Sequence, residues 1–199
     1  MPIAEAMSLS MYWVWTSEPT TEDTPVIRGG ATLIDELDVE FDSGFAVSSR
    51  VPVIEIARDE QSQGTLTDSV IVRGAGLLFS SRLRQVLASL SVDNIQYFPA
   101  VVRNPIDGTK TDDYQMANII GRVSCLDRQK SIVEIEAEDD DVVSFVDVLV
   151  IDEVKANGFD LFRLHEEPEM IIASERVKQA CEAHQITGVQ FFAPPDYPY

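Results

Sequence analysis

The chain has 199 residues, of which 45% are hydrophobic and 25% charged, and this composition excludes an intrinsically disordered polypeptide. Its 34 Asp and Glu residues outnumber 15 Lys and Arg residues and give a net charge of −19, which disfavours nucleic acid and anionic membranes as partners and favours a basic protein. The alternative interpretation is that the negative charge only keeps the protein soluble and monomeric.

The first third of the chain predicts short strands joined by polar loops. Residues 11–15 are aromatic and β-favouring, and the proline-containing stretch 16–25 predicts a surface loop. Residues 52–57 and 69–72 have the apolar patterns of strands, and the second of these stretches ends at the glycines of 74–76.

The clearest helix follows these strands. Apolar residues recur at i, i+3, i+4 and i+7, the spacing of one helical face, at Leu83, Val86, Leu87 and Leu90. Ser80 or Ser81 is placed to cap the start of this helix.

Strands dominate the middle of the chain. Residues 94–102 are rich in β-forming residues and stop at 104–108, where a proline and an Asp-Gly pair predict the turn of a hairpin. Three further strands are predicted at 114–124, 131–137 and 142–151. We expect these three to form an antiparallel meander with one solvated face.

The last part of the chain predicts a short strand at 159–164, then a second helix, then a final strand at 189–192. Ile171 and Ile172 lead into this helix, which Ser174 caps and Gly188 ends. Its apolar face has the helical spacing at Val177, Ala180, Cys181 and His184. The whole pattern predicts an α+β fold, mainly antiparallel sheet with two amphipathic helices packed on it.

Cysteine usage and the first residues indicate a compartment. Cys125 and Cys181 are interpreted as reduced thiols, because one bridge would do little for a chain of this length. Residues 1–15 have no basic residue ahead of their apolar ones and contain Glu5, so a secretory signal is not expected. No apolar run is long enough to cross a bilayer, and we predict a cytoplasmic protein.

Common catalytic and nucleotide-binding motifs are absent, so the sequence predicts no catalytic residue, cofactor or metal. The competing hypothesis is an unrecognised hydrolytic enzyme that uses His165, His184, Cys125 or Cys181. Cys181 and His184 share one helical face and could seat a metal, but a buried thiol beside a partly buried imidazole is the favoured interpretation.

One cation and two acidic runs stand out as candidates for interactions. Arg163 lies in an apolar strand, and a structural ion pair is favoured there over anion binding. Each acidic run is either a solvated loop or an exposed anionic surface for a basic partner. The candidate partner-binding residues are Glu138, Asp139, Asp140 and Asp141 in the first run, and Glu166, Glu167 and Glu169 around Pro168 in the second.

Several short stretches between about residues 70 and 192 match the pattern of a known family, most clearly in the last part of the chain, at 161–164, 171–175 and 187–191. The other matching positions are Tyr114, Asn118, Asp127 and Ser131, with the stretches 78–80 and 97–99. Through these residues the chain resembles the immunity protein family eleven of bacterial polymorphic toxin systems.

This resemblance implies a bacterial protein that is encoded beside a toxin and neutralises it, or a secreted effector, by direct binding. It implies no enzymatic activity and no catalytic residues. The length fits a single domain, 1–199, in which residues 1–69 are less recognisable and 70–199 are family-like. The alternative is an acidic regulatory or adaptor subunit that binds a protein other than a toxin.

Overall fold

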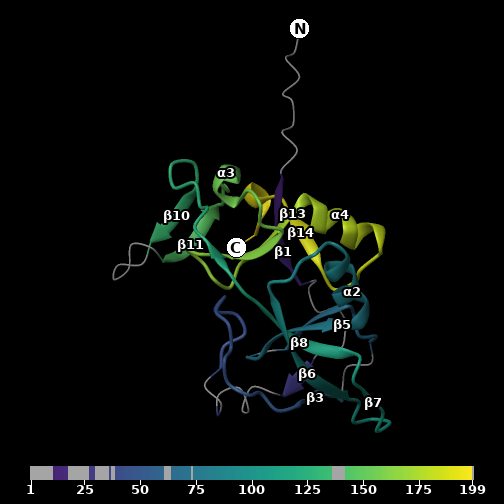
Figure 1. The fold of residues 1–199 in the computed structure, drawn as a ribbon. Helices are drawn as coiled ribbons and strands as arrows, with labels where there is room; N and C mark the ends of the chain where they lie inside the picture. The colour runs from purple at the N-terminus through teal and green to yellow at the C-terminus, as the bar shows by residue number, and fades with distance from the viewer. Residues whose placement is uncertain are drawn as a thin grey trace.

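The computed structural model describes residues 11–17, 27–29, 36, 39–60, 64–72, 74–135 and 142–198. Strands account for most of the regular structure in these ranges, with the helices α2, α3 and α4, so the predicted mainly-sheet α+β fold is confirmed. Figure 1 shows a strand-built lower part and an upper part in which α4 lies over a second sheet.

The lower part is a small closed barrel. Its strands are β2 (Ile27–Gly29), β3 (Ile54–Arg58), β4 (Ser69–Val72), β5 (Gly76–Ser80), β6 (Ile95–Arg103) and β8 (Tyr114–Ile119). They pair in the order β3-β2-β4-β5-β8-β6, and β6 pairs back with β3 to close the ring. The predicted hairpin after β6 is confirmed, because β7 (Lys110–Thr111) pairs with β6 in antiparallel fashion.

Alternation in the strands fills the barrel interior. Ile54 and Ile56 of β3 are buried while Glu55 between them is exposed, because successive side chains of a strand face opposite sides. These two residues join Phe41, Leu78 and Met116 in one apolar cluster.

The upper part is a five-stranded sheet that unites the two ends of the described chain. Its strands are β1 (Tyr12–Thr16), β9 (Arg122–Val123), β12 (Leu161–Leu164), β13 (Ile171–Ser174) and β14 (Gln190–Phe192). The order is β14-β1-β13-β12-β9, so β1 lies between two strands from the end of the chain. The sequence pattern placed strands near β1 and β14 but missed β13 as a strand.

The predicted three-stranded meander is wrong. The first of its strands divides, because β8 ends at Ile119 inside the barrel and β9 pairs in parallel with β12 of the other sheet. Gly121, at φ +106, lies at the turn between them. Only the last two strands form a hairpin, β10 (Ile132–Ile135) with β11 (Val143–Val148), followed by the short helix α3 (Glu153–Ala156).

Both predicted amphipathic helices are confirmed together with their caps. Helix α2 (Ser81–Ser89) starts after Ser80, whose hydroxyl accepts a hydrogen bond from the amide of Leu83. Helix α4 (Glu175–Ala183) starts after Ser174, which caps in the same way. The expected end at Gly188 is wrong, because α4 ends at Ala183.

Gly188 has a different role, at a close crossing of two chain segments. Its φ is +79, and a Cβ at this position would lie 2.1 Å from the carbonyl oxygen of Ser69. The carboxylate of Asp68, next to this crossing, accepts hydrogen bonds from the amide and hydroxyl of Thr187, each at 3.0 Å. The segment after α4 is thereby tied to the start of β4.

The barrel and the five-stranded sheet share an apolar core under α2 and α4. Trp15 and Leu161 of the sheet pack there with Phe79 and Ile119 of the barrel and with Val177 of α4. Because side chains of both parts pack in one cluster, the barrel and the five-stranded sheet are held in a fixed arrangement. The candidate site lies where these two parts meet.

Candidate functional site

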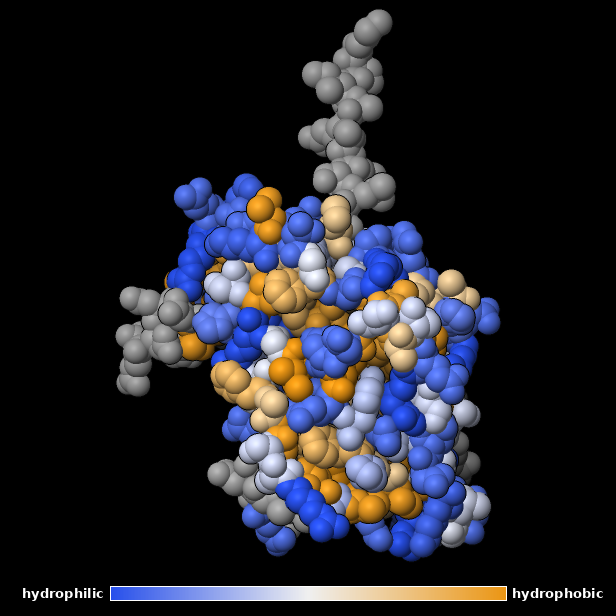
Figure 2. Space-filling model, in the orientation of Figure 1, coloured by the Kyte–Doolittle hydropathy of each residue, from blue (hydrophilic) through white to orange (hydrophobic). Residues whose placement is uncertain are grey.

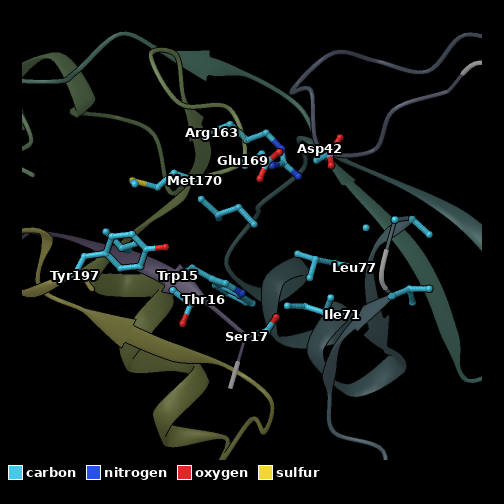
Figure 3. A pocket seen from close by; sticks show the side chains of 16 residues that line it. Trp15, Thr16, Ser17, Asp42, Ile71, Leu77, Arg163, Glu169, Met170 and Tyr197 are labelled. Carbon is cyan, nitrogen blue, oxygen red and sulfur yellow. The ribbon is translucent and has the colours of Figure 1, made fainter. Parts of the chain in front are cut away.

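A groove with a volume of about 320 Å³ opens where the two parts of the fold meet. Figure 3 shows its lining side chains, which come from β1 and β13 on one side and from β4 and β5 on the other. The apolar part of the lining includes Val14, Trp15, Ile71, Leu77, Met170 and Ile171. Charged residues, Asp42, Arg163 and Glu169, lie together at one end.

Trp15 supplies a hydrogen-bond donor to the groove wall. Its ring packs in the core, with ring centroids 5.8 Å from Phe79 and 5.4 Å from Phe191. The indole Nε1 of Trp15 and the hydroxyl of Ser17 are both buried and have no hydrogen-bond partner among the described residues. Because residues i and i+2 of an extended chain face the same side, the two polar groups belong to the same wall.

Arg163 holds the charged end of the groove in place. It is 2% exposed, and its guanidinium donates to three backbone carbonyls: to Pro168 at 2.7 Å, to Phe41 at 3.0 Å and to Ile119 at 3.3 Å. These carbonyls belong to the acidic loop after β12, to the segment before β3 and to the end of β8. One buried side chain therefore fixes three separate segments.

The ion pair predicted for Arg163 is wrong for the described residues, because its side-chain hydrogen bonds go to backbone carbonyls where a carboxylate was expected. Burial lowers the pKa of Arg163 to about 10, and the carboxylates of Asp42 and Glu169 oppose this shift. Both of these carboxylates are exposed. The guanidinium is thus occupied internally, while the acidic groups around it face solvent.

Gly44 allows the segment that carries Asp42 to lie directly on two arginines. Its φ is +78, and a Cβ there would come within 2.8 Å of the Arg122 side chain and 3.3 Å of Arg163. Arg122 in turn donates from Nε to the carbonyl of Ser43 and lies 4.4 Å from the centroid of the Phe45 ring. The position of Asp42 is therefore set by neighbours on both sides.

The structure divides the acidic residues that the sequence suggested as partner-binding. Residues 138–141, Glu138, Asp139, Asp140 and Asp141, lie outside the described residues. Glu166 is 1% exposed, and its Oε1 accepts a hydrogen bond of 2.6 Å from the Ser124 hydroxyl, so it is not part of an exposed acidic surface. Glu167 is half-buried and Glu169 is exposed, and both line a smaller pocket beside the groove with Met170 and Tyr197.

Both cysteines are buried free thiols, and His184 is exposed. Cys125 and Cys181 are buried in different apolar clusters, and burial raises the pKa of each thiol to about 12. His184, expected to be partly buried beside Cys181, is exposed at the end of α4. Within the described ranges, no three His, Cys, Asp or Glu side chains are grouped so that they could hold a metal ion.

Sequence reasoning missed most of the groove. Trp15, Ser17, Asp42 and Ile71 are distant in the sequence, and no local motif joins them. One signal for an exposed apolar residue was available at β4, where Val70, Ile71 and Val72 are consecutive. Because neighbouring side chains of a strand face opposite sides, such a run places an apolar side chain on each face. The structure places Ile71 outward with 52% exposure.

Comparison with protein families gives a match over most of the chain. The model of an immunity protein family, Imm11, matches residues 11–193. The match extends beyond residues 70–192 and takes in β1 and the first barrel strands. No curated protein matches the chain. None of the helices in the described ranges has both the length and the apolar character needed to cross a membrane.

Proposed function

Because the chain belongs to the Imm11 immunity protein family, we propose that it is a bacterial immunity protein that binds and neutralises a cognate toxin or secreted effector. The observation that carries this proposal is the family match over residues 11–193. The protein acts in the cytoplasm of the producing cell, by forming a complex and not by catalysis.

The charge supports a basic partner. A net charge of −19 attracts a basic protein at long range and raises the rate at which the two meet, by about 10- to 1,000-fold in comparable systems. The exposed carboxylates of Asp42 and Glu169 beside an apolar groove give this attraction a local target. A toxin that acts on nucleic acid needs a basic surface and fits this description.

The state of the cysteines and of His184 supports binding over catalysis. A nucleophilic cysteine needs a lowered pKa and access to substrate, whereas Cys125 and Cys181 are buried with raised pKa values. A general base needs a partner group within hydrogen-bond reach. His184 is exposed at the end of α4 and is not part of the apolar cluster that contains Cys181.

Co-expression with the product of the neighbouring gene tests the proposed function. The two proteins are produced in a sensitive bacterial host, growth is scored, and the complex is then purified through a tag on one of them. Rescue of growth together with a stable one-to-one complex is the expected result. Rescue without a complex would indicate enzymatic antagonism, and no rescue with no complex would favour the adaptor alternative.

The contribution of charge is tested by salt. The association rate is measured by stopped flow, with an inactive toxin variant, between about 0.1 M and 1 M NaCl, where the screening length falls from about 10 Å to about 3 Å. We expect the association rate to fall steeply over this range while the dissociation rate changes little. A rate independent of salt would remove electrostatic steering from the proposal.

A further inference from the structure

The groove between the barrel and the five-stranded sheet contains three features that a ligand could use: unpaired donors, an exposed apolar side chain and exposed carboxylates. We propose that this groove is the toxin-docking site and that its occupant is an extended, basic segment of the toxin. The inference rests on the proposed function, which it deepens by assigning a surface and the chemistry of the segment that enters it.

The first feature is a pair of hydrogen-bond donors without a partner on one wall of the groove. The indole N–H of Trp15 and the hydroxyl of Ser17 lie two residues apart and have no partner among the described residues. Two residues of an extended chain span about 6.8 Å. An extended segment presents its backbone carbonyls on one side with the same repeat, so one such segment offers acceptors to both donors once it enters between the walls and displaces the groups that cover these buried atoms.

The second feature is an exposed apolar side chain on the opposite wall. Ile71 of β4 is 52% exposed although it lines a groove with Leu77 and Met170. Figure 2 shows further hydrophobic patches along the boundary between the upper and lower parts of the molecule, separated by hydrophilic residues. A segment that lies along β1 can place one apolar side chain against Ile71.

The third feature is the negative charge at one end of the groove. Figure 3 shows Asp42 and Glu169 on either side of Arg163. Arg163 is 2% exposed and donates from Nε, Nη1 and Nη2 to three carbonyls of its own chain, so it is poorly placed to bind an anionic ligand. The neighbouring Arg122 does not line the groove, since it donates to the carbonyl of Ser43 and lies against the Phe45 ring. The charges that face solvent at this end of the groove are therefore the two carboxylates, which favour a Lys or Arg of the partner.

A second copy of this chain fits the groove poorly. Each copy has a net charge of −19, so two copies repel each other. A basic segment of a different protein is therefore the occupant that the charges favour.

A matched pair of substitutions tests the groove. Ile71→Lys puts a cation on the groove wall, and Ile106→Lys makes the same change in net charge at a residue of similar exposure, 59% against 52%. Ile106 lies in the turn between β6 and β7. Figure 1 shows β7 at the end of the barrel away from the five-stranded sheet. Both side chains lie outside the apolar core clusters, so neither change disturbs core packing.

The measurement is calorimetric titration of each variant with the product of the neighbouring toxin gene, in a catalytically inactive form. Ile71→Lys is expected to raise the dissociation constant by at least about 30-fold, as for a residue at the centre of an interface. Ile106→Lys is expected to stay within about 3-fold of the unmodified protein. Equal effects of the two variants would overturn the proposal.

Two further variants separate the donors from the charge. Trp15→Phe keeps an aromatic ring and removes the N–H, and about 10-fold weaker binding is expected. Asp42→Asn is compared with Asp112→Asn, an exposed aspartate in the loop between β7 and β8, and only Asp42→Asn is expected to weaken binding. Circular dichroism and thermal unfolding confirm that each variant is folded.

The outcomes distinguish the groove from the function. If the unmodified protein neither binds the toxin nor rescues growth, the proposed function fails and the groove proposal fails with it. If the unmodified protein binds and Ile71→Lys binds equally well, the immunity function stands and the groove is not its docking site.

Discussion

Replacing Arg163 should lower the stability of the fold, because this groove-lining side chain holds three separate segments together. Arg163→Met keeps an unbranched apolar stem and leaves three carbonyls, those of Phe41, Ile119 and Pro168, without their donor. At about 1 kcal/mol for each unpaired carbonyl, the free energy of unfolding should fall by about 3 kcal/mol.

The matched control is Arg103→Met, which removes the same charge from the surface. Arg103 pairs with Glu55 at 3.1 Å, and their side chains are 44% and 71% exposed, so the pair is screened by solvent. Its loss should lower the free energy of unfolding by at most about 1 kcal/mol. Urea unfolding of both variants is followed by the fluorescence of Trp13 and Trp15. A difference below about 1 kcal/mol between them would refute the role assigned to the carbonyl contacts.

Three further predictions follow from the core and from the chain crossing beside it. Gly188→Ala should lower the free energy of unfolding by about 3 kcal/mol, measured in urea, because its Cβ would lie 2.1 Å from a backbone oxygen at a φ of +79. Asp68→Ala should cost about 3 kcal/mol in the same assay, since it leaves buried donors unpaired, and Asp112→Ala on the surface should cost less than about 0.5 kcal/mol. Burial raises the pKa of Cys125 and Cys181 from 9.0 to about 12, so only the unfolded chain loses these protons between the two values. The contribution of these two thiols to stability should be level below about pH 9 and should be lost as the pH rises towards 12, so the alkaline fall in stability should be shallower in a Cys125→Ala, Cys181→Ala variant.

Short-range patterns predicted the elements whose cause is local. The start of α2 follows from Ser80 and from Leu83, which lie three residues apart and contact each other directly. The same holds for Ser174 at the start of α4, and for the turn that joins β6 to β7. In each case the stabilising hydrogen bond forms between groups a few residues apart, so the printed sequence contains all of its parts.

The end of α4 is a feature that local sequence patterns predicted wrongly. Gly188 is a residue that commonly ends helices, yet it is required here by the carbonyl of Ser69, which is far away in the sequence. Likewise, Glu166 and Glu169 stand in one acidic run, and only tertiary contacts bury the first beside Ser124 and expose the second. Composition predicted an acidic surface but not which carboxylates belong to it.

The composition and the periodic patterns thus determined an acidic, mainly-sheet protein with two capped helices, and the family to which the chain belongs was recognisable from short stretches. The tertiary structure alone decided that β1 pairs with β13 and β14, that the central strands divide between two sheets, and that Trp15 meets Ile71 across a groove. The physical reason is that strand pairing and groove walls depend on contacts between residues distant in the chain. A strand's sequence specifies which side is apolar but not which strand lies beside it.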